Sequence, residues 1–218
     1  MPSTSRGIPF FLIVPPKATA GRSRRAEVSF ECSCFGETSH VSKTCSAWSC
    51  SGRGVCGISS IPMKILFVCL GNICRSPLAE VIFAEHVRQS GLDHQISVDS
   101  AGTAGYHAGE RVDPRTRACA ARHSLEITHR ARAVVPADFE TFDLLVAMDE
   151  SNASDLRRRA PHAQASRKIR LMRDWDPSGP GEVPDPYYGG EADFDHVWHL
   201  CDRSSPRLLA EIQKQESL

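Results

Sequence analysis

The sequence predicts an α/β domain in which a four-stranded parallel sheet carries helices on both faces. Continuous apolar runs, typical of strands that are buried on both sides, recur along the chain from residue 63 onward. Segments with helical start and stop signals alternate with these runs. Strands that alternate with helices are joined by right-handed crossovers, which place the helices against the two faces of a parallel sheet.

The first strand is expected over residues 64–68, Lys-Ile-Leu-Phe-Val, and a helix follows it directly. Ser76 is expected to cap this helix and Pro77 to take its first position, because proline lacks the N–H that this position leaves unused. The helix should run to Ser90, where Gly91 ends it.

The later elements follow the same alternation. The second strand is expected over Ile96 to Asp99, and Asp113 with Pro114 opens a second helix that reaches about His123. The sequence then predicts a strand over 142–148, a short helix over 151–158, a strand over 168–172, a loop rich in Pro and Gly over 176–190, and a last helix from about 194 to 213. Ligands of such sheets bind beyond the carboxyl ends of the strands.

Residues 1–62 differ from the rest of the chain and are expected to be disordered, because they are rich in Ser, Gly and Thr without a sustained period. The apolar patch at 8–14 faintly resembles a signal peptide, and the lack of acidic residues before Glu27 is compatible with a transit peptide. We favour a third interpretation, in which Met63 is the true start and the segment before it is an over-extended reading frame. The domain is therefore expected over 63–218.

Charge and cysteine content limit the class of protein. Residues 1–62 hold seven Lys and Arg against three Glu, whereas the remainder holds 19 basic and 23 acidic residues, so the main body is not expected to bind nucleic acid. No apolar run approaches the roughly 18 residues that span a bilayer. The five cysteines before residue 63 fit neither a zinc pattern nor complete disulfide pairing, and the few in the body indicate a reducing cytoplasm.

The chemistry is expected in the segment 69–77, Cys-Leu-Gly-Asn-Ile-Cys-Arg-Ser-Pro, where the first strand ends and a helix begins. A loop that closes onto a helix N-terminus directs its N–H groups inward, which makes a seat for a phosphate dianion. The same field favours a thiolate at Cys69, and the thiolate is the form that attacks. Arg75, six residues later, can bind two phosphate oxygens with its planar fork.

A cysteine and an arginine six residues apart should also occur about once by chance in this composition. Cys201 and Arg207 repeat the spacing, but that segment lacks a glycine and a preceding strand. We interpret the second pair as a coincidence.

If the Cys69 thiolate displaces phosphate from tyrosine, the leaving group is a phenol with a pKa of about 10. Such a group departs slowly as its anion, so an acid is needed to protonate it. Asp185 is the best candidate, because its loop is braced by Pro184 and Pro186 and released by two glycines. From local sequence alone, a plain turn aspartate is as good an interpretation.

Four motifs together resemble the low-molecular-weight protein tyrosine phosphatases. They are the cysteine loop and the segments 99–103 (DSAGT), 147–152 (AMDESN) and 185–188 (DPYY), in family order between Met63 and about Gln213. The resemblance implies a single flavodoxin-like domain without metal or organic cofactor, acting on phosphotyrosine proteins. We expect a monomer or weak dimer.

The resemblance also implies residue roles. Cys69 would be the nucleophile, Arg75 the phosphate ligand and Asp185 the acid and then the base. Asn72 would shape the loop and Ser76 would donate to the thiolate, while the remaining expected contacts to phosphate or substrate are Leu70, Gly71, Ile73, Cys74, Tyr106, Tyr187 and Tyr188.

Two positions bear on substrate preference. Tyr106 stands before His107 where family members often have Trp, which would shift the preference. Ile73 stands where relatives specific for arginine phosphate resemble one another in carrying Thr, so an aryl substrate is favoured.

Several further residues have two interpretations. Cys74 either pairs with Cys69 on oxidation, protecting it from sulfinic acid, or is a small buried thiol. His107, His123 and His129 are expected to be surface or structural hydrogen-bonders. Asp149 and Asn152 are expected to cap or brace a helix near the site.

Two other functions remain open. An arsenate reductase on the same fold would use the same loop but needs further cysteines, of which only Cys119 is plausibly placed. The second is a non-catalytic phosphate-binding module with a zinc site in residues 1–62. The presence of both a nucleophile and an acid argues against it, because binding alone needs neither.

Overall fold

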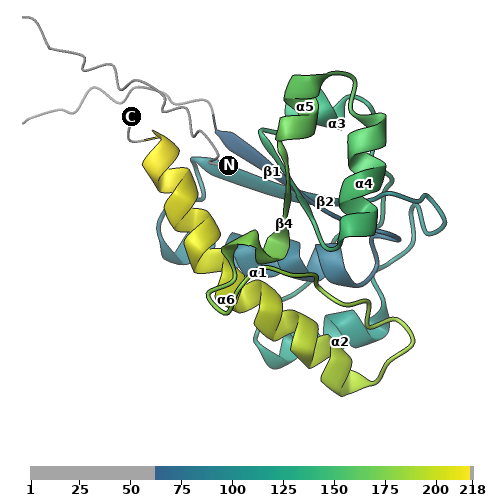
Figure 1. Cartoon of the computed structure of the whole chain (residues 1–218). Coiled ribbons are helices and arrows are strands. Elements are labelled where there is room, and N and C mark those ends of the chain that lie inside the picture. Colours follow the sequence, from purple (N-terminus) through teal and green to yellow (C-terminus); the bar gives the residue numbers. More distant parts are fainter. Residues whose placement is uncertain (1–61, 217–218) are drawn as a thin grey trace, which may run out of the picture. The chain divides into compact units, whose positions relative to one another are not determined.

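Four parallel strands form one sheet in the order β2-β1-β3-β4 in the computed structural model, which describes residues 62–216 (Figure 1). β1 covers Met63–Cys69, β2 Ile96–Gly102, β3 Leu144–Ala147 and β4 Ile169–Leu171. β1 is central, with Cys69 opposite Gly102 of β2 and Val68 opposite Ala147 of β3. The predicted four-stranded parallel sheet is confirmed.

The apolar run of β1 serves two cores because successive side chains of a strand point to opposite faces. Ile65 and Phe67 pack into the larger core, which includes residues of α1 and α6. Leu66 and Val68 pack into the smaller core with Phe139 and Leu145. Burial on both faces explains why this strand reads as a continuous rather than an alternating apolar run.

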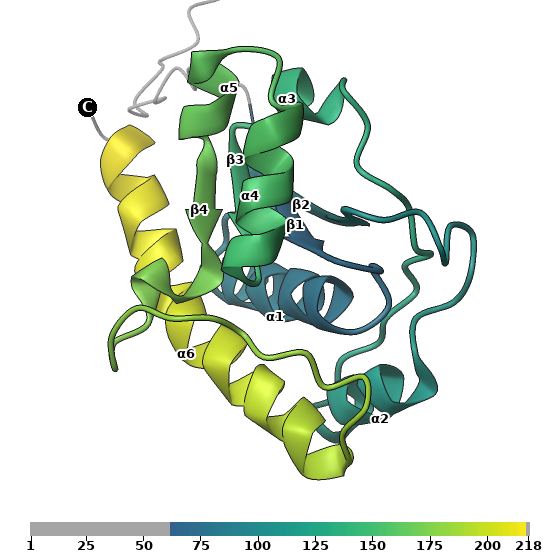
Figure 2. The same cartoon turned by 45° about the vertical axis from the view of Figure 1, so that its right-hand side comes forward.

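Helices cover both faces of the sheet, as predicted (Figure 2). One face carries α1 (Arg75–Gln89), α2 (Pro114–Arg122) and α6 (Glu191–Glu216). The other carries α3 (Asp138–Thr141), α4 (Glu150–Arg159) and α5 (Ala163–Arg167), while the 3₁₀ turn η1 (Met172–Trp175) follows β4.

The start of α1 corrects two predictions. The helix begins at Arg75, so Ser76 lies in its first turn and does not cap it, and Pro77 takes the third helical position instead of the first. The Ser76 hydroxyl instead lies in the site described below. Two other helix signals are confirmed: Asp113 accepts from the Arg115 N–H at the start of α2, and Gly91 lies just after α1 with a φ of 68°.

Other boundaries differ from the predicted ones. β2 continues to Gly102, three residues beyond its predicted end, because the ladder with β1 continues to Cys69. β3 and β4 are shorter than predicted at both ends, and α6 begins earlier, at Glu191. The short helices α3 and α5 were not predicted, since four or five residues cannot display a helical period.

The predicted disorder of the N-terminal segment, and its five cysteines, lie outside the described residues. Within residues 62–216, no helix combines the length and the apolar content that crossing a bilayer requires.

Candidate active site

The Cys69 loop, residues 69–75, links the carboxyl end of β1 to α1 at the edge where parallel-sheet proteins bind ligands. The end of β2 supports this loop, since Thr103 N donates to Cys69 O at 2.8 Å and Ala104 N to Leu70 O at 2.9 Å. A Cβ atom at Gly102 would lie only 2.7 Å from Leu70 O. Glycine at this position therefore permits the close approach of the two segments.

Cys69 is 3 % exposed, and its Sγ accepts from Asn72 N at 3.3 Å. The Ser76 hydroxyl oxygen lies 3.0 Å from the same sulfur. That oxygen accepts from Asn72 Nδ2 at 2.9 Å, and its own proton can point to the sulfur or to Ala101 O, which lies 3.3 Å away. When it points to the sulfur, two donors converge on Cys69, an arrangement that stabilises a thiolate.

Asn72 holds the loop in its shape. Its φ of 57° is a left-handed conformation that asparagine tolerates better than most residues. The side chain donates to Ser76 and Ser100, and its oxygen accepts from Arg132 N at 2.8 Å and bonds to His129 Nε2 at 2.8 Å. Asn72 is fully buried, so this network fixes the loop from behind rather than from the cavity.

A second group of polar side chains lies behind Asn72. Ser100 donates to Glu80 Oε2 at 2.6 Å, and burial raises the pKa of Glu80 to about 7. Ligand atoms of Glu80, Asp99 and His129 lie within 4.8 Å of one another, the kind of spacing a metal ion needs. Arg132 already donates to Asp99 at 2.8 Å, so a guanidinium supplies the positive charge there. We therefore interpret Glu80, Asp99 and His129 as structural support for the loop.

Arg75 is 3 % exposed and reaches two carboxylates. One terminal nitrogen donates to Asp149 Oδ2 at 2.6 Å and to Val183 O at 3.2 Å, and the other donates to Asp185 Oδ2 at 2.8 Å. Burial opposes the charged form, but the nearby Cys69, Asp185 and Asp149 outweigh it and raise the pKa of Arg75. The cation is therefore permanent and fixed in direction.

Asp149 has a second task that the sequence did not reveal. It caps α4 by accepting from Asn152 N at 2.6 Å, as expected, and it also orients Arg75. The contact joins residues 74 positions apart, and no local pattern signals such a pairing.

Asp185 lies on the loop 176–190, which is fixed to the end of β3 where Val183 N donates to Met148 O at 2.7 Å. The Asp185 side chain is 44 % exposed, and its Oδ1 accepts from Tyr187 N at 3.2 Å. The carboxyl group is thus held beside Arg75 and stays open to solvent.

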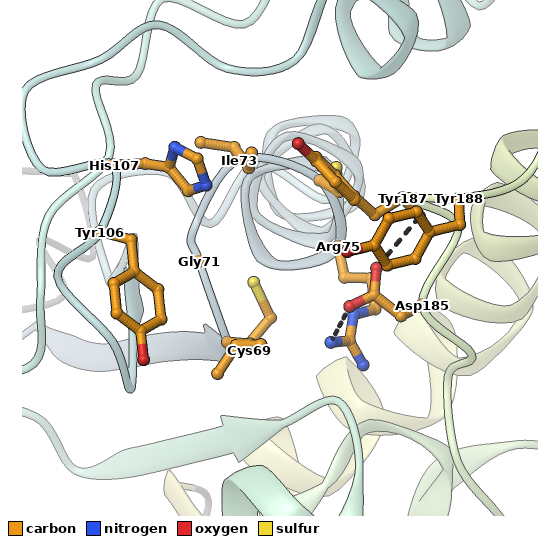
Figure 3. A pocket seen from close by; sticks show the side chains of 11 residues that line it. Cys69, Gly71, Ile73, Arg75, Tyr106, His107, Asp185, Tyr187 and Tyr188 are labelled. Carbon is orange, nitrogen blue, oxygen red and sulfur yellow. Dashed lines mark hydrogen bonds and ion pairs between the residues drawn. The ribbon is translucent and has the colours of Figure 1, made fainter.

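A cavity of about 450 Å³ brings these residues together (Figure 3). Tyr106 and His107 lie on one side, Asp185, Tyr187 and Tyr188 lie on the other, and Cys69 lies between them. Of the residues expected at the site, those that line the cavity are Cys69, Leu70, Gly71, Ile73, Cys74, Arg75, Tyr106, Asp185, Tyr187 and Tyr188. Asn72 and Ser76 lie behind it.

His107 lines the cavity although the sequence favoured a surface or structural role. Its Nδ1 lies 2.8 Å from Glu110 Oε2, and a Cβ at Gly71 would be 3.1 Å from its ring. Its place beside Tyr106 was the only signal that could have found it. The wall is open at the rim, where Tyr106 and Tyr188 are 80 % and 98 % exposed.

The remaining cysteines differ from Cys69. Cys74 lines the cavity, but burial raises its pKa to about 12, which keeps it a thiol at neutral pH. Cys201 is fully buried within α6 and does not line the cavity that Cys69 lines. Within residues 62–216 all four cysteines are free.

Comparison with known proteins agrees with this geometry. A family model described as low molecular weight phosphotyrosine protein phosphatase matches residues 64–218. A low molecular weight protein-tyrosine-phosphatase of Streptomyces coelicolor is 44 % identical over 155 residues, which cover 70 % of this chain and 94 % of the relative. The human low molecular weight phosphotyrosine protein phosphatase is 43 % identical over 147 residues, covering 67 % and 93 %.

A solved structure of a phosphatase also resembles this chain. The protein tyrosine phosphatase from Entamoeba histolytica, crystallised with Hepes in its active site, matches with a TM-score of 0.69 and 39 % identity. The match covers 71 % of this chain and 99 % of that one.

Proposed function

The chain belongs to the low molecular weight phosphotyrosine protein phosphatases, and we propose that it hydrolyses phosphotyrosine through a phosphocysteine on Cys69. The observation that carries the mechanism is the convergence of Cys69, Arg75 and Asp185 on one cavity. In this proposal the three residues act as nucleophile, phosphate-binding cation and acid on a phosphoryl group bound in that cavity.

In the first step the Cys69 thiolate attacks phosphorus in line with the aryl oxygen. The S–P bond forms, the P–O bond breaks, and Asp185 gives its proton to the departing phenolate oxygen. Arg75 and the N–H groups of the loop hold the phosphoryl oxygens as their charge redistributes.

In the second step Asp185, now a carboxylate, takes a proton from water. The water oxygen attacks phosphorus and the S–P bond breaks, which releases inorganic phosphate and restores the thiolate. One carboxyl group serves as acid and then as base because leaving group and water occupy the same side of the phosphoryl group.

The proposed substrates are proteins that carry phosphotyrosine, since the cavity walls include Tyr106, Tyr187 and Tyr188. Aromatic side chains pack well against a phenyl ring. The two adjacent tyrosines 187 and 188 form a T-shaped pair with centroids 5.0 Å apart.

Trapping of the intermediate tests the mechanism. When the wild-type enzyme is mixed with an aryl phosphate and the reaction is rapidly quenched, the protein should be heavier by one phosphoryl group. Peptide mapping should place that group on Cys69. Cys69→Ser should neither turn over nor become labelled, and Asp185→Ala should turn over about 10²- to 10⁴-fold more slowly. Full activity in either variant would refute the assignment.

Arsenate reduction is the competing activity. Its disulfide relay needs accessible cysteines, whereas Cys119 is buried and burial raises its pKa to about 11. Parallel assays with arsenate and 4-nitrophenyl phosphate separate the two activities, and we expect turnover of the phosphate ester only.

We further propose a cytoplasmic location and a domain that starts at Met63. The free thiols of residues 62–216 suit a reducing compartment. The family match from residue 64 supports the boundary. Intact-mass measurement of the native protein would test where the chain begins.

A further inference from the structure

Arg115 lies in the first turn of α2, outside the set of residues that line the cavity. Its guanidinium nevertheless reaches the turn that follows Asp185. One terminal nitrogen donates to Tyr187 O at 2.9 Å and the other to Gly189 O at 3.2 Å. A single side chain thereby ties down two carbonyl groups of the loop that carries the acid.

The same guanidinium also lies over two aromatic rings. Its central carbon lies 5.7 Å from the centroid of Tyr187 and 4.8 Å from that of Phe194 in α6. Contacts of this kind are attractive because the ring faces are electron-rich. Arg115 therefore contacts the Tyr187 backbone and ring and the helix that follows the loop.

The other end of the connection is Asp113. Its carboxylate accepts from Arg115 Nε at 3.1 Å and from a terminal nitrogen at 2.9 Å, a bidentate pair. Its own N–H donates to Ile73 O at 3.0 Å. A continuous path of hydrogen bonds thus runs from the Cys69 loop through Asp113 and Arg115 to the Tyr187 turn.

Asp185 is at the end of this path, because its Oδ1 accepts from Tyr187 N. The carboxylate is 44 % exposed, so packing alone does not fix it. We propose that Arg115 is a positioning residue that sets where the acid Asp185 stands relative to the nucleophile Cys69. This inference rests on the proposed function.

A role in positioning the acid makes a specific demand on the kinetics. A phenol of ordinary basicity needs its proton, whereas a strongly acidic nitrophenol leaves without one. Loss of Arg115 should therefore reduce kcat/KM for phenyl phosphate by about ten- to a hundredfold, since small displacements of reacting groups are costly. The value for 2,4-dinitrophenyl phosphate should stay within about twofold.

The experiment measures kcat/KM for both esters in Arg115→Gln and Arg115→Lys. Lysine keeps the charge but cannot bridge two carbonyls and a carboxylate at once. The kcat/KM of Arg115→Lys for phenyl phosphate should therefore lie between the values of the wild type and of Arg115→Gln. Arg122→Gln is the matched control, because Arg122 also lies in α2 and pairs with Asp195 away from the cavity. It should keep wild-type values with both esters.

Asp185→Ala provides the reference for action through the acid. If Arg115 works through Asp185, adding Arg115→Gln to Asp185→Ala should change kcat/KM for phenyl phosphate by less than about twofold. The inference would be overturned if Arg115→Gln lost kcat/KM equally with both esters, or if its kcat/KM equalled that of the wild type. It would also be overturned if the losses of the two single variants added in the double variant.

The two proposals fail in different ways. Should Asp185→Ala itself show no dependence on the leaving group, the acid assignment of the proposed function is wrong. Should Asp185→Ala show the dependence while both Arg115 variants lack it, only the positioning role is wrong. Thermal unfolding identifies a misfolded glutamine variant, in which case the lysine variant decides.

Discussion

Arg75 donates to Asp185 Oδ2 at 2.8 Å, so the guanidinium proposed to bind phosphate already contacts the carboxyl group proposed as the acid. A phosphate dianion bound against Arg75 therefore competes with the Asp185 carboxylate for the same nitrogen. The two anions also repel each other across a short distance.

Neutralising Asp185 should tighten the binding of inorganic phosphate. We expect the Kd of Asp185→Asn to fall by about three- to tenfold, because a like charge beside the dianion is removed. Calorimetric titration with phosphate at neutral pH measures this. Asp195→Asn, which removes a carboxylate from the distant Arg122 pair, should leave the Kd unchanged. An unchanged or weaker affinity in Asp185→Asn would contradict the competition.

Asp149 combines a helix cap with an ion pair, and two substitutions separate these tasks. Asparagine caps a helix well but lacks the charge that holds Arg75, whereas alanine loses both. Both variants should lose at least about tenfold in kcat/KM, because Arg75 loses one of the two carboxylates that orient it. Only alanine should also lose the cap, which lowers the free energy of unfolding by about 1 kcal/mol more. Urea denaturation and steady-state kinetics measure the two effects, and equal stability of the two variants would argue against the cap.

Cys74 is proposed to protect Cys69 against irreversible oxidation. Both cysteines line the same cavity, so a Cys69 sulfenic acid could condense with Cys74 to form a disulfide and water. The Cys74 pKa of about 12 keeps its thiolate scarce, so this condensation should be slow. After brief peroxide treatment, wild type should regain most activity with dithiothreitol and Cys74→Ser should regain several-fold less. Cys119→Ser, which alters a buried cysteine outside the cavity, should recover like wild type. Equal recovery of all three proteins would favour a plain buried thiol.

Asp176 makes the fold sensitive to acid. Burial would raise the pKa of this carboxyl, but hydrogen bonds from Arg203, Ser178 N and Arg173 outweigh it and lower the pKa from 3.8 to about 2. A lowered pKa gives stability that is present above pH 3.8 and is lost as pH falls toward 2. The side chain has no exposed area, so the contribution is roughly 2 kcal/mol.

Unfolding measured at a series of pH values tests this. The wild-type free energy of unfolding should fall more steeply between pH 4 and pH 2 than that of Asp176→Asn, which should start lower at neutral pH. Parallel curves for the two proteins would assign the acid sensitivity to other groups.

Short-range sequence patterns correctly predicted those elements whose structure depends on a few neighbouring residues. The apolar run of β1, the Asp113 cap and the stop at Gly91 are confirmed because cap geometry and two-sided burial act over a few residues. Ser76 shows where such signals mislead. Its hydroxyl is drawn to Cys69 and Asn72 instead of capping α1, since the loop competes for the same group.

By itself, the sequence determined the α/β class, the order of elements and the segment that holds Cys69 and Arg75, because these depend on periodicity and on spacing within one loop. The sequence and its family resemblance already pointed to Asp185 as the acid and to Asp149 near the site, but only the tertiary structure decided that Asp149 holds Arg75 and that Arg115 holds the loop of Asp185. These residues lie on separate elements, and they meet because parallel strands bring their carboxyl ends, and the loops that follow them, to one edge of the sheet.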